Sequence, residues 1–237
     1  MGWGEEIRRR VVPVAHVVTL APSRVVAVVV LAVVLVLVPA LWMRLRLGVT
    51  LVHELGHAVV GLAVGRHFDG FVLRGDMSGH AVTRGRARGV GRVATTWAGY
   101  PAPAVLGALL VWSAGRGWAA PVVTGALAVL LLAATRVRSL LTALVVALAL
   151  AGSAALWWWR DDATQEAVLL GLGVAVVLGG WRHLVALAGD HSATSDPAVL
   201  AALTHVPRLL WTATFVLVHG AAGWLVVTQL ASAVRAG

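Results

Sequence analysis

The chain has 237 residues, of which 59% are hydrophobic and only 12% are charged, and its mean hydropathy is +0.88. Soluble domains are about half apolar and about a quarter charged, so this composition excludes a secreted enzyme, a nucleic-acid-binding module and a disordered chain. The 19 basic residues, all of them arginine, outnumber the 10 acidic residues and fall mainly in short segments between apolar blocks. Such loop charges are typical of a membrane protein.

In chain order, the apolar residues form about seven segments of roughly 18 to 22 residues, the length of a helix that crosses a bilayer. These segments are Val25 to Trp42, Leu47 to Val64, Val93 to Trp112, Ala119 to Thr135, Ser139 to Trp159, Ala167 to Ala188, and Leu209 to Leu230. We therefore expect an all-α fold, a polytopic transmembrane helix bundle of about six to seven spans.

The arginines also predict an orientation. Counted on alternate sides of these spans, most of them fall in the amino-terminal tail and in the segments 66–92, 136–138 and 189–208. Because loops rich in arginine stay in the cytoplasm, we expect the amino terminus and these segments to be cytoplasmic. The arginine-rich, alanine-rich composition is typical of a bacterial protein, so the expected location is a bacterial plasma membrane.

The segment 66–92 differs from the other loops. Short runs of alternating β-forming residues are interrupted there by glycines, a pattern that predicts a small β-hairpin. Asp76, between Gly75 and Gly79, could contact a substrate or could simply accept hydrogen bonds in a turn.

The second apolar segment contains His53-Glu54-Leu55-Gly56-His57, the pattern H-E-x-x-H. Residues four apart lie on the same face of a helix, so His53 and His57 can supply two ligands to a tetrahedral zinc ion. Glu54 lies beside them and can act as general base and then general acid for a water molecule that the metal activates. Cysteine is absent, which excludes thiolate ligands.

Two other interpretations of this cluster remain open. Ionisable groups in an apolar helix are costly and usually functional, yet the three residues could form a metal-free hydrogen-bonded cluster or a proton relay. His183 and His219 also lie in apolar segments, where we expect polar contacts between helices.

The sequence resembles the site-2 protease family of intramembrane zinc metallopeptidases, particularly its compact bacterial members. The resemblance is carried by three stretches: Leu51 to Ala58 with the following Gly61 and Gly65; Gly75 to Gly79 leading into Ala98-Gly99-Tyr100-Pro101-Ala102-Pro103; and Ser195 to Ala201 continuing to Trp211. The second stretch is similar to the small-residue, proline-containing helix that packs beside the zinc helix in that family.

The resemblance implies that the third zinc ligand is an aspartate from a later helix. The usual family motif around that aspartate is missing, and the chain has no asparagine. Asp196 is favoured because it belongs to the third similar stretch, and Asp190, at the end of the sixth apolar segment, is the alternative. His191 could also coordinate a metal, although a lone loop histidine is more often solvated.

The resemblance further implies a zinc metalloendopeptidase that hydrolyses peptide bonds of membrane-embedded or membrane-proximal substrates. We expect an amino-terminal tail over residues 1–24 and a single integral membrane metallopeptidase-like domain over residues 25–237. The expected partners are the lipid bilayer and a transmembrane protein substrate, with no nucleic acid; the oligomeric state is open. The alternatives are a membrane transporter or metal carrier that uses the His and Glu cluster, and a catalytically silent membrane scaffold.

Overall fold

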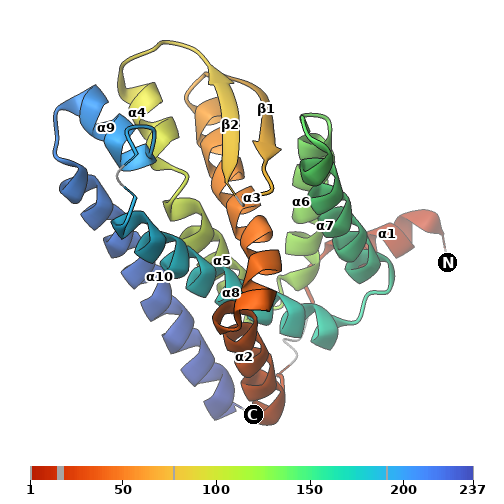
Figure 1. The fold of residues 1–237 in the computed structure, drawn as a ribbon. Coiled ribbons are helices and arrows are strands. Elements are labelled where there is room, and N and C mark those ends of the chain that lie inside the picture. The colour runs from red at the N-terminus through yellow and green to blue at the C-terminus, as the bar shows by residue number, and fades with distance from the viewer. Residues whose placement is uncertain (1, 15–18, 77, 191, 237) are drawn as a thin grey trace.

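A computed structural model describes residues 2–14, 19–76, 78–190 and 192–236, which form ten helices and one antiparallel two-stranded sheet (Figure 1). The elements in chain order are α1 (Trp3–Val11), α2 (Pro22–Leu37), α3 (Pro39–Ala63), β1 (His67–Leu73), β2 (Gly79–Arg84), α4 (Val90–Trp97), α5 (Pro101–Ala114), α6 (Ala119–Ala134), α7 (Leu140–Trp158), α8 (Asp162–Ala188), α9 (Asp196–Thr204) and α10 (Arg208–Ala236).

The predicted fold class is confirmed: the protein is helical, and a small β-hairpin follows the helix that carries the H-E-x-x-H pattern. In the described part of the chain, α7, α8 and α10 are each long and apolar enough to cross a membrane. Helices α2 and α3 meet this criterion together but are bent by 95° at the break between them. Helices α5 and α6 are shorter apolar helices.

The break between α2 and α3 corrects two predicted boundaries. The sequence predicted one span up to Trp42 and a loop before Leu47, but α2 already ends at Leu37 and α3 runs unbroken from Pro39. Proline lacks a backbone N–H and disfavours a helical conformation at the preceding residue, and Val38 is accordingly extended.

A second predicted span, Val93 to Trp112, is also interrupted. Helix α4 ends at Trp97, and α5 begins at Pro101 after a turn. The turn brings the backbone of Gly99 toward α3, which a straight helix would not do.

The amino-terminal tail packs against the carboxyl end of α7 and the turn before α6. A guanidinium nitrogen of Arg10 donates to the carbonyl of Trp158 over 2.7 Å, and the backbone N–H of Val14 donates to the carbonyl of Gly117. Trp158 is the last residue of α7, and Gly117 lies in the turn before α6; the arginine pattern predicted both places on the side opposite to the tail. At the other end of α7, the backbone of Arg138 bonds Phe71 of the hairpin.

The tail and the hairpin therefore lie at opposite ends of the 19-residue helix α7. Helices α2 and α3, which the sequence predicted as two complete crossings, meet the criterion for a span only together, with a bend of 95° between them.

Two close contacts hold the elements around the site. Gly107 of α5 and Gly173 of α8 let the two helices touch backbone to backbone: a Cβ at Gly107 would lie 2.6 Å from the Gly173 carbonyl oxygen. The hairpin is anchored by Phe71 and Leu73, which are almost fully buried; the Leu73 N–H also donates to Thr142 Oγ1 of α7 over 2.7 Å. The hairpin thus lies beside α3 at the same end as α4 and α9 (Figure 1).

Candidate metal centre

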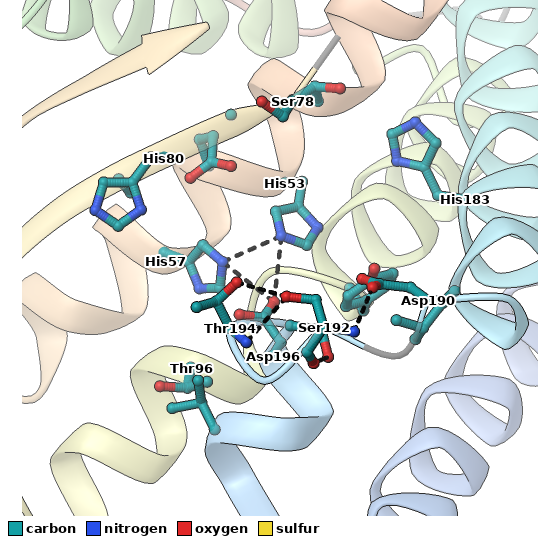
Figure 2. A pocket seen from close by; sticks show the side chains of 18 of the residues that line it. His53, His57, Ser78, His80, Thr96, His183, Asp190, Ser192, Thr194 and Asp196 are labelled. Atoms are coloured by element: carbon teal, nitrogen blue, oxygen red, sulfur yellow. Dashed lines mark hydrogen bonds and ion pairs between the residues drawn. The ribbon is translucent and has the colours of Figure 1, made fainter. Parts of the chain in front are cut away.

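Helix α3 places His53 and His57 one turn apart, and their Nε2 atoms lie 3.1 Å from each other. The carboxylate oxygen Oδ2 of Asp196 lies 3.3 Å from His53 Nε2 and 3.4 Å from His57 Nε2. Figure 2 shows the two imidazoles and this carboxylate converging from two separate parts of the chain. The three side chains could hold a metal ion.

Asp196 reaches the histidines because it stands in the first turn of α9. Pro197 follows it at the start of the helix and is buried together with Leu200, and α9 packs against α4 and α10. The segment before α9 is held by Arg208, which donates to the carbonyl of Asp190 over 3.0 Å and to Ser195 Oγ over 2.9 Å.

The donor set fits a divalent cation. Asp196 Oδ2 is buried and has no hydrogen-bond partner within the described residues, although it faces two nitrogen atoms. Two imidazole nitrogens and a carboxylate oxygen that converge on one point are stabilised by a cation, and two imidazoles with one carboxylate suit zinc.

Gly99 leaves the space that such an ion would need. A Cβ added at Gly99 would lie 2.6 Å from His53 Nε2 and would also collide with His57 Nε2. Because a glycine has no side chain, the turn between α4 and α5 can approach the two nitrogens without blocking the point on which they converge.

Electrostatics support an ionised carboxylate at this position. Burial acts to raise the pKa of Asp196, but the imidazoles of His57 and His53 outweigh that effect and hold the pKa well below its ordinary value. The neighbouring rings therefore favour the carboxylate form of Asp196, the form in which it can bind a metal.

Glu54 lies beneath the hairpin. Glu54 is only 4% exposed. A Cβ added at Gly79 of β2 would lie 2.5 Å from Glu54 Oε1. The glycine at this register position lets β2 cover the carboxylate closely, so the hairpin shields Glu54 while leaving it beside the histidines.

A cavity of about 540 Å³ opens over the three converging side chains. It is lined by α3, β2, α4, α8 and the segment that leads into α9. The lining includes the polar side chains of Arg46, Ser78, His80, Arg92, Tyr100 and His183. Its size is within the range of small-molecule and peptide pockets.

The structure separates the two candidate third ligands. Asp196 joins His53 and His57, whereas Asp190 lies at the cavity wall and accepts a hydrogen bond from the Ser192 N–H over 2.8 Å. Asp76 likewise accepts from the N–H and hydroxyl of Ser78, which is a turn contact.

Among the described residues, His183 and His219 do not join the group of His53, His57 and Asp196. His183 lines the cavity and packs edge-on against Trp42 of α3, as expected for a contact between helices. His219 is completely buried, and its Nδ1 donates to the Phe215 carbonyl within the same helix. His191, considered as a ligand, and Met77, in one of the similar stretches, lie outside the described residues.

The sequence did not single out Thr95, Gly79, Gly99 or Tyr100 as site residues. Gly99 and Tyr100 do belong to a stretch for which packing beside α3 was predicted, and the structure shows that packing: a Cβ at Gly56 would lie 2.8 Å from the Ala98 carbonyl oxygen. The small residues on both sides of this predicted helix contact were the sequence feature that could have indicated these site residues.

Comparison with known proteins gives a family match. A family model described as peptidase M50B-like matches residues 26–226 of the chain. Searches of curated proteins and of solved structures return no match.

Proposed function

Because the chain belongs to the M50B-like peptidases, which are the site-2 protease family of intramembrane metallopeptidases, we propose that it is a zinc endopeptidase acting on transmembrane proteins. The observation that carries this proposal is the convergence of His53, His57 and Asp196 beside Glu54. We assign the first three as metal ligands and Glu54 as the catalytic base and acid.

A zinc ion bound there would act as a Lewis acid toward the scissile carbonyl and lower the pKa of a water molecule. Glu54 then takes a proton from the attacking water as the new C–O bond forms. It returns the proton to the leaving amine as the C–N bond breaks, so the carboxylate is regenerated.

The hairpin is the proposed substrate platform. A transmembrane helix satisfies its own backbone hydrogen bonds and must unwind before cleavage. Within the described residues β2 pairs only with β1, and His80, Ala81 and Thr83 of β2 line the cavity. An unwound substrate strand can therefore bind along β2 by β-strand addition.

Water reaches the site from the end of the molecule at which the hairpin and α9 meet. Ser192 and Thr194 are exposed and line the cavity there, so the entrance is polar. We place residues 25–237 as the catalytic domain in the plasma membrane of a bacterium, with residues 1–24 as its tail.

The test is a comparison of the parent protein with Glu54→Gln after purification in detergent. Both should hold zinc, because Glu54 is not among the ligands. The parent should cleave a model single-span substrate, and the variant should lose about 10²- to 10⁴-fold in rate. An inactive parent, or a variant as active as the parent, contradicts the proposal; ion flux without cleavage would point to a transporter.

A further inference from the structure

Tyr100 stands beside the metal ligands, in the turn between α4 and α5. Its ring meets the His53 ring edge-on, with centroids 4.8 Å apart and an interplanar angle of 87°. On its other side it stacks on Phe215 of α10, at 5.1 Å and 18°. The ring is therefore held in one orientation by two aromatic contacts.

The hydroxyl of this tyrosine is available for a ligand. Tyr100 lines the cavity. Among the described residues, no hydrogen bond involves its phenol oxygen. That oxygen is also not one of the buried polar atoms that lack a partner. The phenol thus offers a fixed hydrogen-bond donor within the cavity.

Tyr100 and Glu54 approach the metal ligands from different sides. Glu54 lies under Gly79 of the hairpin, whereas Tyr100 packs with residues of α8, α9 and α10, among them Leu200 and Phe215. When Glu54 delivers the attacking water from the hairpin side, the carbonyl oxygen of the substrate points away from Glu54. A carbonyl held between the two groups would then direct its oxygen toward the Tyr100 side.

Four other donors in the cavity are less well placed. The Thr95 hydroxyl donates to the Gly91 carbonyl over 2.7 Å, and Ser78 and His80 belong to the hairpin side together with Glu54. His183 is on the α8 wall, but its Nε2 is buried beneath the surface of the described structure.

We propose that the Tyr100 hydroxyl donates a hydrogen bond to the scissile carbonyl oxygen as that oxygen gains negative charge, an inference that depends on the proposed peptidase function. The water oxygen bonds to the carbonyl carbon, and the carbonyl π electrons move onto the oxygen that Tyr100 contacts. When the C–N bond breaks, the carbonyl re-forms and Tyr100 keeps its proton throughout. A preorganised donor of this kind acts mainly on the transition state.

The test uses Tyr100→Phe, which removes only the hydroxyl and keeps both ring contacts. Zinc content and the midpoint of thermal unfolding should equal those of the parent. On the single-span substrate, kcat should fall about 10²- to 10³-fold while KM changes little. Affinity for a phosphinic peptide that matches the cleaved sequence should fall in parallel with kcat, because this probe has the tetrahedral geometry and anionic oxygens of the transition state.

His183→Gln serves as the comparison, since His183 is another polar side chain that lines the cavity. It should cost much less in kcat than Tyr100→Phe. The inference is overturned if Tyr100→Phe retains the kcat of an active parent, if it loses zinc, or if His183→Gln causes the larger loss. A parent without peptidase activity overturns the proposed function itself and is distinguishable, because that failure is seen before any Tyr100 variant is compared.

Discussion

The carbonyl oxygen of Thr95 lies 2.7 Å from Nδ1 of His57. A carbonyl can only accept, so Nδ1 carries a hydrogen, and in the neutral ring the lone pair of His57 is then on Nε2, the atom that faces His53 and Asp196. A backbone contact from α4 thus selects the tautomer that can bind a metal. Such outer contacts orient histidine ligands in metal sites generally.

The close approach of the α4–α5 turn makes Gly99 a sensitive position. Gly99→Ala should abolish metal binding, because the added Cβ would occupy the space on which His53 Nε2 and His57 Nε2 converge. Metal analysis of the purified variant measures this directly. Gly125→Ala is the matched control, since a Cβ at Gly125 meets nothing within 4 Å; equal metal content in both variants would contradict the assigned site.

The two aspartates should behave differently when each is changed to asparagine. Asp196→Asn should lose at least about tenfold in metal affinity, because it removes one of three charged or imidazole donors. Asp190→Asn should keep the metal, since the side chain oxygen of Asp190 is bound to the Ser192 N–H. Competition with a zinc chelator gives the two affinities, and a larger loss in Asp190→Asn would reverse the assignment.

The absence of cysteine allows the bent crossing to be tested by single-cysteine labelling. Glu5→Cys in the tail and Arg88→Cys after the hairpin both place the thiol at exposed positions. In intact cells a membrane-impermeant maleimide should label only one of the two thiols, because the tail and the hairpin lie at opposite ends of helix α7.

The variant that is not labelled in intact cells should react only after the membrane is permeabilised. If the amino terminus is cytoplasmic, as the arginine pattern predicted, the protected variant is Glu5→Cys. Labelling of both thiols in intact cells would show that the tail and the hairpin share a side, and the single bent crossing would then be wrong.

The contact between α5 and α8 should be intolerant of a single methyl group. In Gly107→Ala the new Cβ would lie 2.6 Å from the Gly173 carbonyl oxygen and from Val177 Cγ2, so the helices must separate. Overpacking of this kind costs about 1 to 3 kcal/mol, which should lower the midpoint of thermal unfolding by several degrees. Gly152→Ala in α7, where a Cβ meets nothing within 4 Å, should leave the midpoint unchanged or higher; equal midpoints would contradict the packing.

The sequence by itself determined the features that depend on local patterns. Apolar composition predicted a membrane helix bundle, and alternating residues with glycines predicted the hairpin. The four-residue spacing of His53 and His57 was enough to place both imidazoles on one helix face, because helix geometry alone relates them.

The tertiary structure decided the features that depend on contacts between distant segments. It brought Asp196 to the histidines instead of Asp190, set the tail and the hairpin at opposite ends of α7, and placed Gly99 and Tyr100 at the ligands. None of these follows from periodicity, because each depends on how separate helices pack and on one proline break at the start of α3. Local spacing defines the face of a single helix, whereas the partner of that face is chosen by the packing of the whole bundle.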